Sequence, residues 1–335
     1  MTNIDSYFRS DTGQKRTINE DAAGAFEPTD SRQLRESGCL YIVADGLGGH
    51  QFGEKASAHA VDTLLKGYYE TPELPPEKRL RDVIQLINQN LIAYARENVA
   101  AGEKVATTIV AAVERNGTLQ VAHVGDSRAY LLREGELRQV TRDHSFVGEL
   151  LRSGSITEEE AQQSPYRNRL MRSLGGKDEN VEVDITSPIP LQPGDLILLC
   201  TDGLTQYAGE QDILSAAENG DTRQIVERLI QFANAHGGSD NITVSAVRYT
   251  QRSAPAILPS WKTLAAFGAA TLVLVVLAFF GVQLVRRIIT PPIAPTATLL
   301  STPTAALLPT LTASPLPTLT ATPTRTPQPT PSETP

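Results

Sequence analysis

The stretch Leu40-Tyr-Ile-Val-Ala-Asp45-Gly-Leu-Gly-Gly-His50 starts as an unbroken apolar run and ends in an acid followed by glycines. The apolar run predicts a buried strand, and Asp45 stands where that strand ends. The glycines allow the backbone to turn sharply and to approach a ligand closely. This stretch therefore predicts a strand end that holds an ion.

Five other acids stand in similar places along the chain. Each lies in a loop or at a strand end, next to glycine, asparagine or another acid: Glu20, Asp21, Asp126, Asp202 and Asp240. A single acid beside a glycine is more often a turn than a ligand. The repetition favours one shared site, although for Asp126 a turn whose carboxylate caps the backbone is an equal alternative.

Carboxylates gathered at one end of a sheet repel one another unless cations neutralise them. Sites made of oxygen ligands suit hard ions such as Mg²⁺ or Mn²⁺. A pair of such ions polarises water and stabilises the oxygens that attack and leave in phosphoryl transfer. The acids therefore predict a two-metal centre that hydrolyses phosphate esters.

The remaining pattern predicts a mixed α and β domain. Strands are predicted over residues 4–9, 22–26, 181–185, 195–200 and 242–249, with an antiparallel meander over 107–113, 119–124, 129–132 and 137–140. Helices are predicted over 56–65, 80–92, 212–218 and 222–235, where most apolar residues recur at helical spacing. Residues 143–177 form a polar excursion, with a helix expected to start at Ser155.

Composition limits the classes of protein that fit. The 335 residues carry a net charge of -8, which argues against a nucleic-acid partner because phosphate backbones are met by clustered Lys and Arg. The two cysteines, Cys39 and Cys200, lie at the edges of apolar runs, which predicts buried reduced thiols. Residues 1–16 are polar and contain no apolar stretch typical of a signal peptide.

The last part of the chain differs in character from the first 250 residues. After a linker over 251–262, residues 263–285 contain no charged side chain and are long enough for a transmembrane helix, which needs roughly 20 residues. Residues 286–335 are rich in Pro and Thr, which predicts a disordered tail. We expect a single-pass protein of the cell membrane, with a cytoplasmic catalytic domain and an extracellular tail. Arg286 and Arg287 oppose this orientation, while Arg248, Arg252 and Lys262 offset them.

Six segments taken together resemble the ordered motifs of the metal-dependent protein phosphatases of the protein phosphatase 2C type, in particular the bacterial branch. They are Arg16-Thr-Ile-Asn-Glu20-Asp21, Val43-Ala-Asp45-Gly46-Leu-Gly-Gly-His50, Val124-Gly-Asp126-Ser-Arg128, Thr141-Arg-Asp143-His-Ser145, Cys200-Thr-Asp202-Gly203 and Gly238-Ser-Asp240-Asn241. The resemblance covers residues 1–250. Each motif alone is weak evidence, but six in the right order are specific.

The resemblance implies a set of ligands for two ions, Mg²⁺ or Mn²⁺. It makes Asp45 the bridge between them, with the Gly46 carbonyl on one ion and Asp202 and Asp240 on the other. Glu20 corresponds to the family acid that reaches the ions, often through water.

Three further roles follow from the same resemblance. Asp21 corresponds to an acid that orients the metal-bound waters, and Asp126 to a ligand of a third, weaker metal site. Arg16 corresponds to the arginine that grips the substrate phosphate, with Arg9 as its competitor for that role.

The fold implied is α+β, a four-layer α-β-β-α sandwich of two antiparallel sheets flanked by helix pairs. The activity implied is hydrolysis of phosphoserine and phosphothreonine in proteins by a metal-activated hydroxide, with no phosphoenzyme. The partners implied are phosphorylated proteins, among them a serine/threonine kinase. The catalytic domain itself is expected to be monomeric. The excursion over 143–177 corresponds to the flap beside the site. The alternative is a membrane-tethered, non-catalytic sensor that binds metal and phosphoprotein.

The sequence departs from the family pattern at two positions. Leu47 stands where some members have a histidine that protonates the leaving group, so the general acid is left unassigned. Ala106 replaces a glycine before Thr107, a change expected to be tolerated. His50 and His144 are expected to be hydrogen-bonded structural residues.

Overall fold

The computed structural model describes residues 4–48, 52–100, 103–167 and 169–250, which all lie in one compact unit, Met1–Ala256. Within these ranges no helix combines the length and the apolar character that a bilayer crossing requires. The predicted linker, transmembrane helix and tail, residues 251–262, 263–285 and 286–335, lie outside the described residues.

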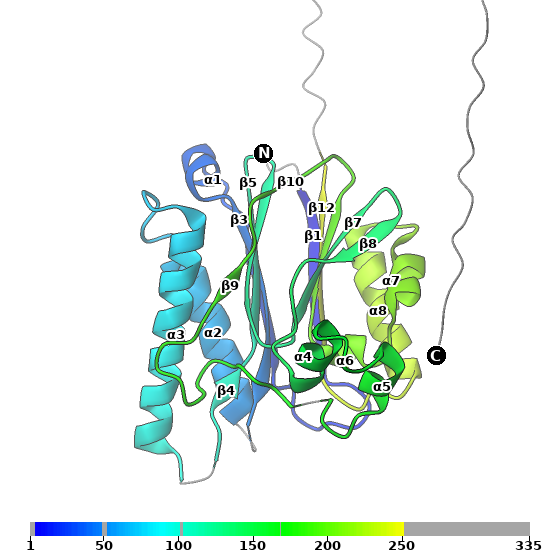
Figure 1. Ribbon diagram of the computed structural model, residues 1–335. Coiled ribbons are helices and arrows are strands. Elements are labelled where there is room, and N and C mark those ends of the chain that lie inside the picture. The colour runs from blue at the N-terminus through cyan, green and yellow to red at the C-terminus, as the bar shows by residue number, and fades with distance from the viewer. Residues whose placement is uncertain (1–3, 49–51, 101–102, 168, 251–335) are drawn as a thin grey trace, which may run out of the picture. The chain divides into compact units, whose positions relative to one another are not determined.

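Two antiparallel sheets form the centre of the domain (Figure 1). The five-stranded sheet has the order β1 (Ile4–Asp11), β12 (Ile242–Tyr249), β11 (Leu196–Cys200), β7 (Arg128–Arg133) and β8 (Glu136–Gln139). The seven-stranded sheet has the order β10 (Ile189–Pro190), β6 (Thr118–Val124), β5 (Ile109–Arg115), β3 (Cys39–Leu47) and β2 (Asp21–Phe26), with β4 (Ala106–Thr107) on β3 and β9 (Asp184–Ile185) on β6.

Strand β3 is apolar throughout because both of its faces are covered. Successive side chains of a strand point to opposite faces of the sheet. Tyr41 and Val43 pack into the core between the two sheets, whereas Leu40 and Ile42 pack into a second core beneath the helices. By the same alternation Asp45 shares the face of Tyr41 and Val43, so it is directed toward the facing sheet.

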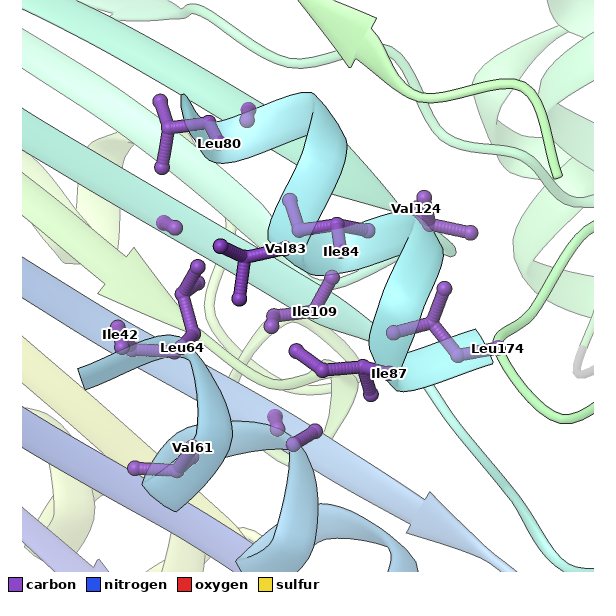
Figure 2. Packing of buried hydrophobic residues seen from close by; sticks show 14 of the residues in the cluster. Ile42, Val61, Leu64, Leu80, Val83, Ile84, Ile87, Ile109, Val124 and Leu174 are labelled. Carbon is purple, nitrogen blue, oxygen red and sulfur yellow. The ribbon is translucent and has the colours of Figure 1, made fainter. Parts of the chain in front are cut away.

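Helix pairs cover the two outer faces and complete the four layers predicted. Helices α2 (Phe52–Gly67) and α3 (Pro76–Asn98) pack on the seven-stranded sheet, and α7 (Glu210–Ala217) and α8 (Thr222–Ala235) on the other (Figure 1). Figure 2 shows the apolar side of α3 above Ile109 of β5. Leu80, Ile84 and Ile87 recur at helical spacing and are fully buried there.

The predicted single meander is wrong, because its strands belong to both sheets. Strand β6 pairs with β5, while β7 pairs with β11 and β8, so the chain crosses between sheets after Val124. The chain crosses at Gly125, whose φ of 111° is rarely adopted by residues that carry a side chain.

The structure also contains short helices that the apolar pattern did not indicate. They are α1 (Ser31–Ser37), α4 (Phe146–Arg152) and α6 (Asp202–Thr205). Helix α5 (Glu158–Gln163) starts after Thr157, not at Ser155, because the Thr157 hydroxyl accepts the Glu160 amide in a capping box. Both Cys39 and Cys200 are free and buried, as predicted.

Candidate active site

The seven-stranded sheet brings three of the acids together at one end of its strands. Strands β3 and β6 are both antiparallel to β5, so they run in the same direction and their C-terminal ends lie at the same end of the sheet. Asp45 lies near the end of β3 and Asp126 follows the end of β6. Strand β2 runs the other way and begins there, which places Asp21 directly opposite Asp45.

The five-stranded sheet supplies two more acids at the same end of the sandwich. Asp202 follows β11, and Asp240 precedes β12, which is antiparallel to β11. Burial and the charges of Asp21, Asp202, Asp126 and Asp240 together raise the pKa of Asp45 well above its ordinary value. Charges act with this strength only over short distances, so the predicted acids share one site.

The acids strongly disfavour one another's ionised form. Burial, followed by the charges of Asp202 and Asp143, raises the pKa of Asp126 to about 8. Burial raises the pKa of Asp21 to about 7 against the opposing hydrogen bonds of two threonines. Several carboxylates that cannot all be charged together fit hard divalent cations, whose binding supplies the missing positive charge.

Asp126 therefore lies in the acid cluster. Besides a hydrogen bond with its own backbone, it contributes to the charge that raises the pKa of Asp45. Its place in the cluster fits a ligand, and its hydrogen bond to its own backbone fits the turn residue that is the alternative.

Glu20 joins the cluster from the loop before β2. Its Oε1 is buried and has no hydrogen-bond partner among the described residues, an arrangement that leaves this oxygen available to a cation or its water. Gly53, at the start of α2, makes room for the carboxylate, since a Cβ there would lie 2.5 Å from Oε1. Gly46 is similarly required, because its Cβ would lie 2.4 Å from the Glu20 carbonyl oxygen and 2.2 Å from that of Gly53.

A threonine pair fixes the backbone of Asp45. The Asp45 amide donates to Thr108 Oγ1 at 3.0 Å, and the Asp45 carbonyl accepts from Thr107 Oγ1 and from the Thr108 amide, both at 2.8 Å. Ala106 is buried in β4 opposite Leu47. The role of this threonine pair in holding the Asp45 backbone was not predicted from the sequence.

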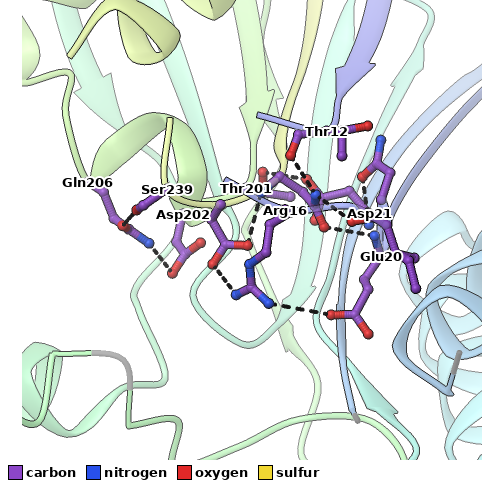
Figure 3. Close-up of polar contacts among 12 residues, drawn as sticks. Thr12, Arg16, Glu20, Asp21, Thr201, Asp202, Gln206 and Ser239 are labelled. Carbon is purple, nitrogen blue, oxygen red and sulfur yellow. Dashed lines mark hydrogen bonds and ion pairs between the residues drawn. The ribbon is translucent and has the colours of Figure 1, made fainter. Parts of the chain in front are cut away.

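Hydroxyl groups from the facing sheet hold Asp21. Its Oδ2 accepts from Thr201 Oγ1 at 2.9 Å and from Thr243 Oγ1 at 2.7 Å (Figure 3). These bonds join the start of β2 to β11 and β12, and so they link the two sheets at the site.

Arg16 lies at the mouth of the cluster. Its Nη2 is 2.9 Å from Asp240 Oδ2. Its Nη1 is 3.9 Å from Glu20 Oε2 (Figure 3). The side chain is 47% exposed, so it can meet a ligand that arrives from solvent. Its competitor Arg9 is bound to Glu227 and Asp11, so of these two arginines it is Arg16 that contacts Glu20 and Asp240.

Asn241 was quoted in a motif but assigned no role. Its Oδ1 accepts the Glu20 amide at 2.8 Å, and its Nδ2 donates to the carbonyls of Thr12 and Ile18, both at 3.0 Å. The amide therefore fastens the loop that carries Arg16 and Glu20 to the start of β12. No local pattern predicts this link, because it joins segments more than 220 residues apart.

The position after Gly46 offers no general acid. Leu47 has no proton to give, and His50 lies outside the described residues.

Residues 13–244 match the family model described as Protein phosphatase 2C. The chain belongs to the protein phosphatase 2C family. The serine/threonine phosphatase stp of Listeria monocytogenes serovar 1/2a is 41% identical over 245 residues, which cover 72% of this chain and 94% of that protein. The protein phosphatase PhpP of Streptococcus pneumoniae is 34% identical over 250 residues, which cover 73% and 97%.

Solved structures of the protein phosphatase 2C family agree with this assignment. The Mycobacterium tuberculosis serine/threonine phosphatase PstP/Ppp matches with a TM-score of 0.65 at 34% identity, over 74% of this chain and 99% of that chain. The catalytic domain of PstP in complex with 2 manganese ions matches with a TM-score of 0.64 at 33% identity, over the same shares of 74% and 99%. The predicted family and its dependence on Mg²⁺ or Mn²⁺ are confirmed.

Without metal, we expect this phosphatase domain to lose stability as the pH rises from 6 to 8.5. The pKa values of Asp21 and Asp126 are raised in the folded state to about 7 and about 8, so the stability gained by keeping these groups protonated is lost as pH rises through those values. The melting temperature in EDTA should fall by ~5 °C over this range. Added Mn²⁺ should reverse the trend, and equal melting temperatures at both pH values in EDTA would refute the shared acid site.

Gly53→Ala should weaken metal binding, because the new Cβ displaces the Glu20 carboxylate. We expect the Mn²⁺ concentration for half-maximal phosphatase activity to rise ~10-fold. Gly209→Ala is the matched control, since a Cβ there meets nothing closer than 3.6 Å. An unchanged Mn²⁺ requirement in Gly53→Ala would show that Glu20 does not serve the ions.

Proposed function

We propose that this chain is a Mg²⁺- or Mn²⁺-dependent phosphatase that removes phosphate from serine and threonine side chains of proteins. The observation that carries the proposal is the acid cluster with Arg16 at its mouth, in a chain of the protein phosphatase 2C family. Bound ions supply the positive charge that activates a water and neutralises charge developing on the phosphate.

The proposed roles divide the acids into an inner and an outer group. Asp45 would hold both ions, the Gly46 carbonyl one of them, and Asp202 and Asp240 the other, since Asp45 faces these two acids across the sandwich. Glu20 would serve through its unpartnered oxygen. These residues hold the reacting groups in place and leave the nucleophile to water.

Asp21 and Asp126 would act at the edges of this group. Asp21 has one oxygen fully engaged by two hydroxyls, which suits a group that orients water better than one that binds an ion directly. Asp126 would bind a third, weaker ion beside Asp202, whose charge is, after burial, the largest influence on its pKa.

Arg16 would bind the substrate phosphate. Its guanidinium lies against Asp240 and Glu20, and these contacts hold it at the mouth of the site. A planar guanidinium donates two parallel hydrogen bonds to a phosphate, which lysine does not.

Assays of the full-length protein with Mn²⁺ on a phosphothreonine peptide and on p-nitrophenyl phosphate test this function. Asp45→Ala and Asp202→Ala should abolish turnover, and Arg16→Ala should mainly raise KM, by about tenfold for the loss of a charged hydrogen bond. Arg9→Ala is the control, because its guanidinium is bound to Asp11 and Glu227.

The same assays separate the enzyme from the non-catalytic sensor. Wild-type protein that binds Mn²⁺ but turns over neither substrate would support the sensor and refute the enzyme. A wild-type KM in Arg16→Ala would refute the phosphate-binding role alone.

The cellular setting is a second part of the proposal. The uncharged segment 263–285 would anchor the domain of residues 1–250 to the cell membrane through a single helix, with the domain in the cytoplasm and the tail of residues 286–335 outside. Phosphoserine and phosphothreonine are made where ATP is present, which supports this orientation. A serine/threonine kinase is the proposed partner.

Protease added to intact cells should shorten the protein by removing the tail, while an N-terminal tag stays on the membrane-bound remainder. Lysed cells provide the control, in which the tagged domain is also digested. A full-length band after treatment of intact cells would refute the external tail.

A further inference from the structure

His144 joins two loops through both its backbone and its side chain. Its amide donates to the Gly125 carbonyl at 3.0 Å, and its Nδ1 accepts the Gly125 amide at 3.1 Å. On the other side its carbonyl accepts the Met171 amide at 2.8 Å, and its Nε2 lies 3.3 Å from Asp184 Oδ2. Gly125 immediately precedes Asp126, and Met171 lies where the excursion over 143–177 returns to the sheet.

The hydrogen bonds fix the protonation of the ring. Burial, followed by the charges of His123 and Arg172, lowers the pKa of His144 to about 4, so the imidazole is neutral at neutral pH. Because Nδ1 accepts the Gly125 amide, a neutral ring carries its single proton on Nε2, which lies 3.3 Å from Asp184 Oδ2 and 3.2 Å from Arg172 Nη1.

Asp184 links His144 to the excursion through Arg172. Its Oδ1 accepts from Arg172 Nη1 at 2.9 Å, and the second amino group of Arg172 donates to Glu182 at 2.7 Å. Burial would raise the pKa of Asp184, but the hydrogen bonds of His144 and Arg172 lower it, so the carboxylate is ionised.

This cluster has the spacing of a metal site, but of its two histidines only His123, whose buried Nδ1 has no hydrogen-bond partner among the described residues, presents a lone pair that is not already engaged. One ligand atom each of His123, His144 and Asp184 lies within 4.8 Å of the others. A histidine that binds a metal presents a lone pair to it and donates its other N–H to an acceptor. His144 has the opposite arrangement, and the Arg172 guanidinium, 3.2 Å from its Nε2, already supplies the positive charge.

We propose that His144 is a positioning residue for the third metal site, a role that rests on the proposed function. Through Gly125 it holds the Asp126 loop in the position that binds the ion, and through Asp184 and Arg172 it ties that loop to the returning end of the excursion. Ordering of the excursion and binding of the weak ion are therefore coupled, and each strengthens the other.

Two conservative variants separate the ends of this connection. In His144→Asn the side-chain oxygen can take the place of Nδ1 and accept the Gly125 amide, but the chain does not reach Asp184. In His144→Gln the terminal amide can take the place of Nε2 and donate to Asp184, but the acceptor for Gly125 is lost. His144→Ala removes both, and His59→Ala, on the outer surface of α2, is the matched histidine control.

Two measurements on the full-length protein test the proposal without relying on turnover. Calorimetric titration with Mn²⁺ resolves the weak ion from the tighter ones. Trypsin digestion, followed by mass spectrometry, reports on the excursion, whose Arg167 and Arg169 are exposed. In the wild type and in His59→Ala, saturating Mn²⁺ should slow cleavage after these arginines.

We expect His144→Ala and His144→Gln to bind the weak ion ~10-fold less tightly, with the tighter ions unaffected. His144→Asn, which keeps the contact with Gly125, should bind the weak ion more tightly than His144→Ala but less tightly than the wild type, and should lose the protection from trypsin. Wild-type titrations and wild-type protection in His144→Ala would overturn the proposal, and so would a wild type that binds only two ions. A wild type that binds Mn²⁺ but has no turnover would instead refute the proposed function.

Discussion

Mutual repulsion among carboxylates is the constraint on which this structure depends. Asp21, Asp45, Asp126 and Asp202 are crowded enough to favour each other's protonated form. Nothing in the intrinsic folding of the sheets favours such crowding, which costs stability until cations neutralise it. The rest of the domain supplies the two cores that hold the strand ends in place against this repulsion.

Uncharged hydroxyl and amide groups make the hydrogen bonds that fix Asp45, Asp21 and the loop of Glu20. Thr107 and Thr108 fix the Asp45 backbone, Thr201 and Thr243 fix Asp21, and Asn241 fastens the loop of Glu20. A hydroxyl or amide orients a carboxylate or its backbone without adding charge that would compete with a cation. Among the described residues Arg16 contributes positive charge at the mouth of the site, where a phosphate would bring its own negative charge. The charge of Arg128 acts on Asp126 and Asp202.

The sequence predicted most reliably what depends on period and composition. Strand β12 and helix α8 have the predicted bounds, and all the acids predicted for the site are brought to it. The crossing at Gly125 could not be predicted, because a tight hairpin and a change of sheet need the same few polar residues. Helix α1 was missed because it is held by its Asp30 cap and not by an apolar stripe. Gly53 and Asn241 depend on contacts between distant segments, for which the sequence has no local signal.

The acids of the site come from two different sheets, so ions bound to them would affect how firmly the two sheets are joined. Asp45 comes from one sheet and Asp202 and Asp240 from the other, so ions shared among them would cross-link the sandwich at its open end. Many small domains achieve such a closure with a disulfide, but here both cysteines are free. A metal cross-link is reversible, and its strength follows the concentration of the ion in the surrounding solution. The ions of the catalytic centre would thereby also join the two sheets. The folded domain would be most stable when the ions that activity requires are bound.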